Sequence, residues 1–325
     1  MKVVLIESLG ISKELLDSYA EALRAQGHEF AAYERDLDVE VQKERLKDAD
    51  VLMIANMPLK AEVLDACPNL KFIDVAFTGV DHIPVARAKE LGIAVSNASG
   101  YSNESVAELV LGMTLTLARK VPLADKLTRT GGVIGKNVGF ELQGKTVGII
   151  GTGAIGSRVA ELFNAFGCRV LGYDVHPRNL PNVEYMSMED LLAQSDIVTL
   201  HTPLIDSTRG LINAKTIALM KDGAILINAS RGPVVDAAAL ADALKSGKLA
   251  AAGVDVYDVE PPIPAENPLL DAPNTILTPH IAFLSVEHGQ EFLPGVFVLR
   301  DFGRAVESYC LPLHVAANDV AGALL

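Results

Sequence analysis

Short runs of apolar residues alternate with amphipathic stretches along nearly the whole chain. In the first third of the sequence the apolar runs, which predict buried strands, lie at residues 3–6, 50–55, 71–77 and 93–97. A second series follows at residues 145–150, 168–174, 196–201, 223–228, 249–257 and 274–280. Such alternation is typical of βαβ units, whose parallel strands are buried beneath helices on both faces of a sheet. The pattern therefore predicts an α/β fold with two doubly wound parallel sheets.

Helical periodicity is clearest in two of the intervening stretches. Residues 12–27 and residues 102–120 both carry apolar side chains at helical spacing. The second stretch is expected to begin with a capping box, in which Ser102 or Ser105 pairs with Glu108. Its long apolar stripe predicts packing against another surface.

The size and charge of the chain exclude several classes of protein. A length of 325 residues predicts two domains, because a single core stops growing at about 250–300 residues. The formal net charge of −13 argues against general nucleic-acid binding and against docking on an anionic membrane. The three cysteines lie far apart, and no cluster of His, Asp and Glu has metal-ligand spacing, so we expect neither a disulfide framework nor a metal site. The N-terminus does not resemble a signal peptide, and we expect a cytoplasmic protein.

A glycine-rich segment, GTGAIG, lies between a predicted strand and a predicted helix. Gly151 permits a tight turn, Gly153 lets the backbone approach a pyrophosphate, and Gly156 lets the helix pack closely on the strand. The next predicted strand ends in Asp174, whose carboxylate can accept ribose hydroxyls and repel a 2′-phosphate. The pattern predicts a site for NAD rather than NADP. The alternatives are an ordinary glycine-rich turn and a contact of Arg178 with a 2′-phosphate.

Three further polar segments stand at or just beyond the ends of predicted strands, the edge at which open α/β sheets bind ligands. NASRGPVVD contains Arg231, GVDVYDVEPP contains Asp255 and Glu260, and TPHIA contains His280. A guanidinium can hold a carboxylate in forked geometry, and a histidine can donate a proton to an oxygen that gains negative charge. Taken singly, each is as well explained as a loop residue. Together, downstream of a dinucleotide fingerprint, they predict a catalytic site.

In order and spacing these segments resemble those of the D-isomer-specific 2-hydroxyacid dehydrogenases, the family of D-lactate, phosphoglycerate and hydroxypyruvate/glyoxylate dehydrogenases. The resemblance covers roughly residues 50–284 and includes FTGVDHI, SNESVAEL, GTGAIG, LHTPL, the DVxxxEP pattern and the PH pair. It implies reversible hydride transfer between NAD(H) and a small 2-keto acid or D-2-hydroxy acid. Arg231 then orients the substrate carboxylate, His280 protonates the ketone oxygen, and Glu260 stabilises the imidazolium and orients its ring.

The resemblance also implies the order of domains and a set of ligand contacts. A Rossmann NAD-binding domain at residues 101–284 is inserted into a flavodoxin-like substrate domain formed by residues 1–100 and 285–325. The implied cofactor contacts are Gly151, Gly153, Ala154, Ile155, Gly156, Asp174, Thr202, Pro203, Thr208, Ala229, Ser230, Arg231, Asp255 and His280. The implied substrate contacts are Asn56, Thr78, Gly79, Val80, Tyr101, Arg231 and His280. Asp255 is expected either to bind the nicotinamide carboxamide or to form local backbone bonds as a buried strand-end carboxylate. The alternative for Tyr101 is an aromatic side chain that packs at the hinge and does not contact the substrate.

Two other functions remain as alternatives. An NAD-sensing interaction protein of the same fold can keep the catalytic residues, whereas a formate dehydrogenase of this fold is disfavoured because those enzymes carry glutamine in place of Glu260. The resemblance and the apolar stripe of residues 102–120 also predict a homodimer. The uncharged segment ANMPL disfavours a second carboxylate or a phosphate on the substrate. Beyond residue 284 the resemblance fades, and Pro294 argues against one regular C-terminal helix.

Overall fold

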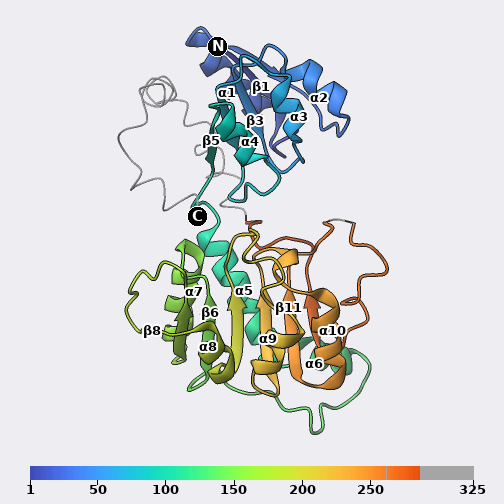
Figure 1. The fold of residues 1–325 in the computed structure, drawn as a ribbon. Coiled ribbons are helices and arrows are strands. Elements are labelled where there is room, and N and C mark those ends of the chain that lie inside the picture. Colours follow the sequence, from blue (N-terminus) through green and yellow to red (C-terminus); the bar gives the residue numbers. More distant parts are fainter. Residues whose placement is uncertain (261, 286–325) are drawn as a thin grey trace. The chain divides into compact units, whose positions relative to one another are not determined.

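The computed structural model describes residues 1–260 and 262–285, and our expectations for residues 286–325 lie outside this range. The described chain forms two compact units, Met1–Tyr101 joined by Ser285, and Ser102–Leu284. Each unit contains one parallel sheet with helices packed on it (Figure 1). The prediction of an α/β fold with two doubly wound parallel sheets is therefore confirmed.

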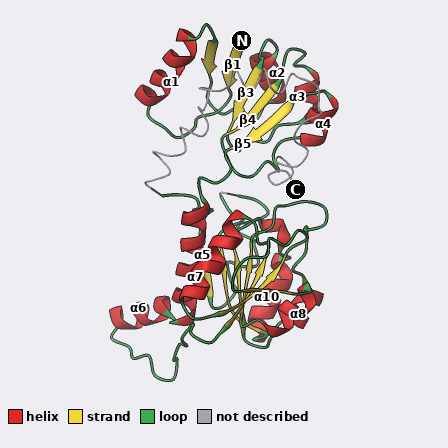
Figure 2. Ribbon diagram, turned by 90° about the vertical axis from the view of Figure 1, so that its left-hand side faces the viewer, coloured by secondary structure: helices red, strands yellow, loops and turns green. Residues whose placement is uncertain are grey.

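The first unit contains a five-stranded sheet in the order β2-β1-β3-β4-β5. Because this order reverses between β1 and β3, successive crossovers place α1 on one face and α2, α3 and α4 on the other (Figure 2). The elements are β1 (Lys2–Leu5), α1 (Lys13–Ala25), β2 (Glu29–Ala32), α2 (Val39–Leu46), β3 (Val51–Ile54), α3 (Ala61–Asp65), β4 (Phe72–Val75), α4 (Val85–Glu90) and β5 (Ala94–Asn97).

The second unit contains a seven-stranded sheet in the order β12-β11-β10-β9-β6-β7-β8. Its order reverses between β6 and β9, which is the strand arrangement of dinucleotide-binding folds with one strand added. The elements are α5 (Asn103–Ala118), α6 (Val121–Arg129), β6 (Thr146–Ile150), α7 (Ala154–Ala165), β7 (Arg169–Tyr173), β8 (Val183–Tyr185), α8 (Met188–Gln194), β9 (Ile197–Leu200), α9 (Ala214–Leu219), β10 (Ala224–Asn228), a 3₁₀ turn η1 (Gly232–Val234), α10 (Ala237–Ser246), β11 (Leu249–Val254) and β12 (Thr275–Leu277).

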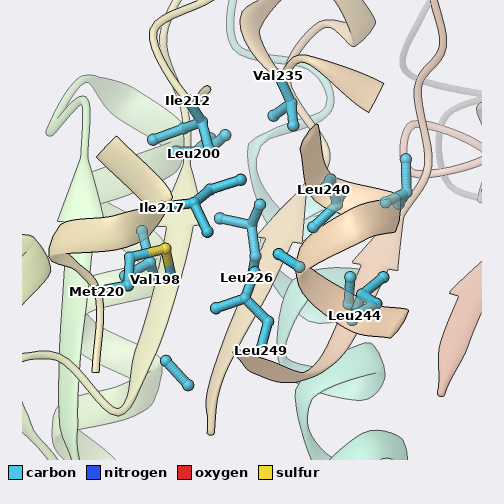
Figure 3. Close-up of a cluster of buried hydrophobic side chains, with 14 of the residues drawn as sticks. Val198, Leu200, Ile212, Ile217, Met220, Leu226, Val235, Leu240, Leu244 and Leu249 are labelled. Carbon is cyan, nitrogen blue, oxygen red and sulfur yellow. The ribbon is translucent and has the colours of Figure 1, made fainter. Parts of the chain in front are cut away.

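Side chains of successive residues in a strand point to opposite faces of the sheet, so the core of this unit is divided between the two faces. Val198 and Leu200 of β9 pack with residues of α9 and α10, including Ile217 and Leu240 (Figure 3). The neighbouring residue Ile197 belongs to the cluster beneath α5 and α7 on the opposite face. Both faces of these strands are thus buried, which explains why their sequences are continuous apolar runs instead of alternating ones.

Two strands, β2 and β8, do not appear among the predicted apolar runs. Each lies at the edge of its sheet, and each contains half-exposed or exposed residues, with the sequences EFAA and VEY. An edge strand has one neighbour and less cover, so its sequence is shorter and less apolar. The hydrophobic pattern therefore located the buried strands and missed these two.

The predicted capping box at the start of α5 is wrong. The helix begins at Asn103, and its N-cap Ser102 makes no side-chain hydrogen bond to the first turn. The Ser105 hydroxyl instead donates to the carbonyl oxygen of Ser102, at 3.2 Å. Serine side chains can bond to nearby backbone groups in several ways, so the sequence pattern alone did not determine which bond forms.

Two further observations concern the apolarity of the helices and the state of the cysteines. No helix within the described range is long and apolar enough to cross a membrane. Cys67 and Cys168 are buried free thiols, and burial raises the pKa of each to about 11. Both thiols therefore stay protonated and weakly reactive near neutral pH.

Candidate active site

The glycine-rich loop joins β6 to α7 in a conformation that larger residues would disturb. Gly151 has a φ of 91°, in the left-handed region, and a Cβ there would lie 2.6 Å from the carbonyl oxygen of His201. A Cβ on Gly156 would collide with the carbonyl oxygen of Gly151. These two glycines therefore hold the start of α7 tightly against the end of β6.

Gly153 differs from the other two glycines because a Cβ on it would meet nothing within 4 Å. It is the N-cap of α7 and has no side chain to cap the free N–H groups of the first turn. The loop lies where the strand order reverses between β6 and β9, the crevice at which such sheets bind ligands. Just beyond β9, the hydroxyl of Thr202 is buried and has no hydrogen-bond partner among the described residues. An open helix N-terminus and an unsatisfied buried hydroxyl both fit a bound dinucleotide.

Asp174 follows β7 at the same edge, and three hydrogen bonds fix its position. Its Oδ2 accepts from the Thr152 backbone N–H at 2.6 Å and from the Thr152 hydroxyl at 3.1 Å, and its Oδ1 accepts from the His176 N–H at 2.9 Å. The Tyr185 hydroxyl in turn donates to the Thr152 hydroxyl at 3.0 Å. The carboxylate is held beside the glycine loop with acceptor capacity left for ribose hydroxyls. Sequence reasoning missed Thr152, which fills a variable position inside the glycine motif, and Tyr185, which lies outside every motif.

The other predicted cofactor residues lie on elements at this edge. Ala154 and Ile155 form the first turn of α7. Pro203 and Thr208 lie in the segment after β9, where the Thr208 hydroxyl donates to the Pro203 carbonyl oxygen at 2.6 Å. Ala229 directly follows β10. Their contacts with a cofactor stay predictions.

The three predicted catalytic segments follow β10, β11 and β12, which are consecutive neighbours in the sheet. Arg231 follows β10, Glu260 lies beyond β11, and His280 follows β12. Because the strands are parallel, their ends meet at one edge, and this edge is also the one that carries the glycine loop. Residues far apart in the sequence are thereby placed along one border of a single sheet.

Glu260 and His280 are in direct contact. Glu260 Oε2 forms a short hydrogen bond with His280 Nδ1, while Glu260 Oε1 accepts from the Tyr257 N–H at 3.2 Å. Their side chains are 31% and 25% exposed, so the pair is partly desolvated yet accessible. The ring of Phe283 lies edge-on to the imidazole at 5.6 Å between centroids. Because Nδ1 is engaged by the carboxylate, Nε2 is the nitrogen that can exchange a proton with a ligand.

Asp255 holds the loop that carries His280. Its fully buried carboxylate accepts from the Thr278 hydroxyl at 2.5 Å and from the N–H groups of Ile281 and Ala282, each at 2.9 Å. The backbone carbonyl of Asp255 also accepts from the His280 N–H at 2.7 Å. These bonds agree with the alternative in which Asp255 is a buried strand-end carboxylate with local backbone bonds. Its contact with a nicotinamide stays a prediction.

His280 itself has a φ of 56°, a left-handed conformation that is uncommon for residues other than glycine. Such a conformation costs about 1–3 kcal/mol and persists where surrounding bonds determine it. Asp255 accepts hydrogen bonds from Thr278 and Ile281, on either side of His280, and these bonds hold His280 in this conformation. The sequence marked His280 and Asp255 separately and did not reveal that one positions the other.

Arg231 is positioned by a turn built on the last residue of β10. Asn228 Oδ1 accepts from the N–H and the hydroxyl of Ser230, at 3.1 and 2.9 Å, and Asn228 Nδ2 donates to the carbonyl oxygen of Arg231 at 3.0 Å. Arg231 Nη1 donates to the Ser230 carbonyl oxygen at 2.7 Å. The next residue, Gly232, packs so closely on the backbone of Tyr257 that a Cβ would collide with it. The guanidinium segment is therefore tied to the segment that leads to Glu260.

A second histidine at this edge has a different character. His201 follows β9, and burial lowers its pKa to about 3. Its Nε2 lies 3.0 Å from the hydroxyl of Thr199. His201 therefore stays neutral across the ordinary working range of pH and cannot supply a proton as His280 can. Within the part of the chain that the structure describes, no group of three or more potential metal ligands occurs.

The predicted substrate residues of the first unit lie at the carboxyl edge of the five-stranded sheet. Asn56 follows β3, the segment from Thr78 to Val80 (including Gly79) follows β4, and Tyr101 lies beyond β5. Asn97, the last residue of β5, donates from Nδ2 to the carbonyl oxygen of Thr78 at 2.6 Å, which ties the end of β5 to the segment after β4. Their contacts with a substrate stay predictions.

A dinucleotide loop on the edge that also carries Arg231, Glu260 and His280 is an arrangement expected of an NAD(P)-dependent oxidoreductase. Residues 111–282 match the model of the NAD-binding domain of D-isomer-specific 2-hydroxyacid dehydrogenases. The chain is 36% identical to a hydroxypyruvate reductase of Blautia hydrogenotrophica, over 91% of this chain and 98% of that protein. It is 40% identical to a D-3-phosphoglycerate dehydrogenase of Archaeoglobus fulgidus, over 98% of this chain and 59% of that protein.

Solved structures agree with this relationship. A D-lactate dehydrogenase from Aquifex aeolicus, complexed with NAD and lactic acid, superposes with a TM-score of 0.83 at 32% identity, covering 95% of this chain and 97% of that one. An acyclic imino acid reductase in complex with NADPH and D-Arg gives a TM-score of 0.85 at 28% identity, covering 95% and 98%. The chain belongs to the D-isomer-specific 2-hydroxyacid dehydrogenase family, whose members are NAD(P)-dependent oxidoreductases acting on CH–OH groups.

Two glycine variants test the dinucleotide loop. Gly153→Ala adds a Cβ in open space, so we expect wild-type melting temperature but weaker NADH binding, because the methyl group would occupy space expected for the pyrophosphate. Gly156→Ala forces the backbone of Gly151 to move, so we expect a loss of roughly 1–3 kcal/mol of stability. Thermal melting and NADH fluorescence titration measure both. Wild-type NADH affinity in Gly153→Ala would contradict this account of the loop.

Proposed function

We propose that the protein reduces a small 2-keto acid to the D-2-hydroxy acid with NADH, using Arg231, Glu260 and His280. The observation that carries the proposal is the contact between His280 Nδ1 and Glu260 on the edge that also holds Arg231 and the glycine loop. The second unit is the NAD-binding domain in this proposal, and the substrate contacts expected of residues in the first unit stay predictions.

Each residue then has one task in the reaction. Arg231 holds the substrate carboxylate through its planar fork of N–H groups. The bound nicotinamide supplies the hydride that the carbonyl carbon receives. His280 donates the proton from Nε2 to the carbonyl oxygen as negative charge develops there, and Glu260 stabilises the imidazolium before the transfer. In the oxidation direction His280 accepts the proton instead.

The pH dependence of the rate tests the acid–base pair. His280 has to carry a proton to act in keto-acid reduction, so the rate is expected to fall with rising pH. Glu260→Gln keeps a hydrogen-bond acceptor but removes the charge that stabilises the imidazolium, so the variant should lose activity at lower pH than wild type. His201 does not contribute to the profile, because its pKa of about 3 keeps it neutral throughout. The measurement is kcat against pH with NADH and a panel of 2-keto acids.

Three further variants complete this test. His280→Ala should lose ~10²-fold or more in kcat with nearly unchanged NADH affinity. Arg231→Lys should also lose most activity, because an ammonium cannot reproduce the fork. Glu266→Gln, an exposed carboxylate six residues beyond Glu260, serves as the control and should behave as wild type. Full activity in His280→Ala would overturn the mechanism, and NADH binding without any keto-acid turnover in wild type would favour the NAD-sensing alternative.

We further propose that NADH is preferred over NADPH. The support is the carboxylate of Asp174, fixed beside the glycine loop by Thr152 and His176. A 2′-phosphate at that position would face a like charge, whereas ribose hydroxyls would face an acceptor. Arg178 lies four residues beyond Asp174, and its contact with a 2′-phosphate is the alternative that would favour NADPH.

Asp174→Asn tests the cofactor preference directly. The variant keeps an acceptor for the Thr152 N–H and removes the negative charge, so the ratio of kcat/KM for NADH over NADPH should fall about tenfold or more. Steady-state kinetics with both cofactors measure the ratio. A wild-type enzyme that uses NADPH equally well would contradict the proposal.

We also propose a homodimer, although the supporting surface differs from the one first considered. The apolar residues of α5, including Val110 and Met113, are buried within their own unit. Exposed apolar side chains gather instead on α6 and the segment after it, where Val121 is 49%, Val133 85% and Val138 73% exposed. Light scattering at micromolar concentration is expected to give twice 34.5 kDa, and Val133→Asp combined with Val138→Asp is expected to shift the mass toward the monomer. A wild-type mass of one chain would rule the dimer out.

The buried free thiols and the acidic net charge support a cytoplasmic location for this enzyme.

A further inference from the structure

The edge strand β8 brings a tyrosine hydroxyl to the glycine-rich loop of the second unit. The parallel pairing of β7 with β8 places Tyr185 directly beside Gly172. A Cβ on Gly172 would lie 2.7 Å from Val183 Cγ1, 3.2 Å from Tyr185 Cε1 and 3.3 Å from Thr152 Cγ2. The absence of a side chain at residue 172 therefore leaves the space in which the ring of Tyr185 and the side chain of Thr152 approach each other.

The hydrogen bonds that link Tyr185 to Asp174 can run in one direction only. An ionised carboxylate accepts and does not donate, so the Thr152 hydroxyl has to give its single hydrogen to Asp174 Oδ2, at 3.1 Å. The same hydroxyl can then only accept from the Tyr185 hydroxyl, at 3.0 Å. Thr152 is fully buried and Tyr185 is partly buried, so water competes little for these bonds. Because consecutive hydrogen bonds polarise one another, the bond from Tyr185 strengthens the bond from Thr152 to the carboxylate.

This chain of bonds determines which oxygen of Asp174 is open to a ligand. A carboxylate has about four positions at which it can accept. Oδ2 receives both the N–H and the hydroxyl of Thr152, whereas Oδ1 receives only the His176 N–H. Among the described residues, the remaining acceptor position of Asp174 is therefore on Oδ1. Its direction is fixed before a ligand binds, because the bonds to Oδ2 hold the plane of the carboxylate.

A carboxylate that is held in this way affects two ligands differently. A ribose that donates hydroxyl hydrogens to Oδ1 would not have to order the Asp174 side chain, which lowers the cost of binding. A 2′-phosphate would meet a negative charge that cannot turn away without breaking its bonds to Thr152. The same bonds therefore favour one cofactor and oppose the other, which is the condition for specificity.

We propose that Tyr185 and Thr152 are positioning residues that set the cofactor preference by holding Asp174 through its Oδ2. The inference rests on the proposed preference for NADH, and the residues that carry it all belong to the second unit. Tyr185 acts through Thr152, and Thr152 acts through Asp174.

Tyr185→Phe tests the first residue of the chain. The variant keeps the ring beside Gly172 and removes the hydroxyl. NADH is expected to bind about three- to tenfold more weakly, the size expected for losing one hydrogen bond, while the affinity for NADPH changes less. Fluorescence titration with each cofactor gives both Kd values without any turnover. The kcat with a 2-keto acid should keep its wild-type value, because Tyr185 is a positioning residue for the cofactor.

Two substitutions of Thr152 separate its hydroxyl from its packing. Thr152→Val keeps the branched shape and the backbone N–H but removes the hydroxyl, so the ratio of the Kd for NADPH to the Kd for NADH should fall at least as far as in Tyr185→Phe. Thr152→Ser keeps the hydroxyl and loses the methyl group, so it should retain the wild-type ratio. Melting temperatures establish that each variant is folded. A ratio that falls in Thr152→Ser and not in Thr152→Val would overturn the proposal.

A double-mutant cycle tests whether Tyr185 acts through Asp174. In the Asp174→Asn background the charge that Tyr185 helps to hold is absent, so adding Tyr185→Phe should change the ratio by less than about twofold. The same loss in both backgrounds would show that Tyr185 affects the cofactor by another route, and the proposal would be wrong.

Tyr173→Phe is the matched control. Tyr173 is the last residue of β7, directly before Asp174, and its side chain packs against the apolar cluster that contains Val198 and Leu200. Removing its hydroxyl should leave the ratio at the wild-type value. Weakening of both cofactors by an equal factor in Tyr185→Phe would assign Tyr185 a purely structural role and refute the inference.

The same titrations distinguish failure of this inference from failure of the proposed preference. Wild type that prefers NADH, together with an unchanged ratio in Tyr185→Phe and Thr152→Val, would refute the inference and leave the proposed function intact. Wild type that binds NADPH as tightly as NADH would refute both.

Discussion

The candidate site depends above all on the buried carboxylate of Asp255. It accepts three hydrogen bonds from the segment between Thr278 and Ala282, and its own carbonyl accepts the N–H of His280. A hydrogen bond to a charged group contributes about 1.5–3 kcal/mol. The three bonds to Asp255 together outweigh the roughly 1–3 kcal/mol of the left-handed conformation at His280, so the loop keeps this conformation. The orientation of His280, on which the proposed proton transfer relies, thus follows from hydrogen bonds to the carboxylate and carbonyl of Asp255.

Both sheets use the same physical arrangement to bring distant residues together. In the second unit, the ends of β10, β11 and β12 align Arg231, Glu260 and His280, and the reversal between β6 and β9 places the glycine loop on that edge. In the first unit, the reversal between β1 and β3 places Glu7 beside Asn56. In both units a carboxylate at or just beyond a strand end, Asp255 or Glu7, accepts from backbone N–H groups of a neighbouring loop that carries a candidate site residue.

The sequence predicted the buried strands, the glycine loop and the segments of the catalytic edge, because each has a local signal. Apolar runs mark strands that are covered on both faces, and β2 and β8 escaped notice because they are edge strands with few apolar residues. The capping box at Ser102 failed because short polar side chains have several backbone partners within reach. The partnerships of Asp255 with Thr278, of Asn228 with Arg231 and of Glu7 with Arg35 carry no local signal. Each depends on which strand ends become neighbours, a property of the folded sheet.

The tautomer of His280 is the most direct test of the central claim, that Glu260 engages Nδ1 and leaves Nε2 for proton transfer. It can be read from side-chain nitrogen chemical shifts in protein labelled with nitrogen-15 histidine, with the resonance assigned by its loss in His280→Gln. The account predicts that the neutral imidazole of His280 carries its proton on Nδ1 and leaves Nε2 without one. A neutral imidazole that carries its proton on Nε2, with Nδ1 deprotonated, would contradict the account.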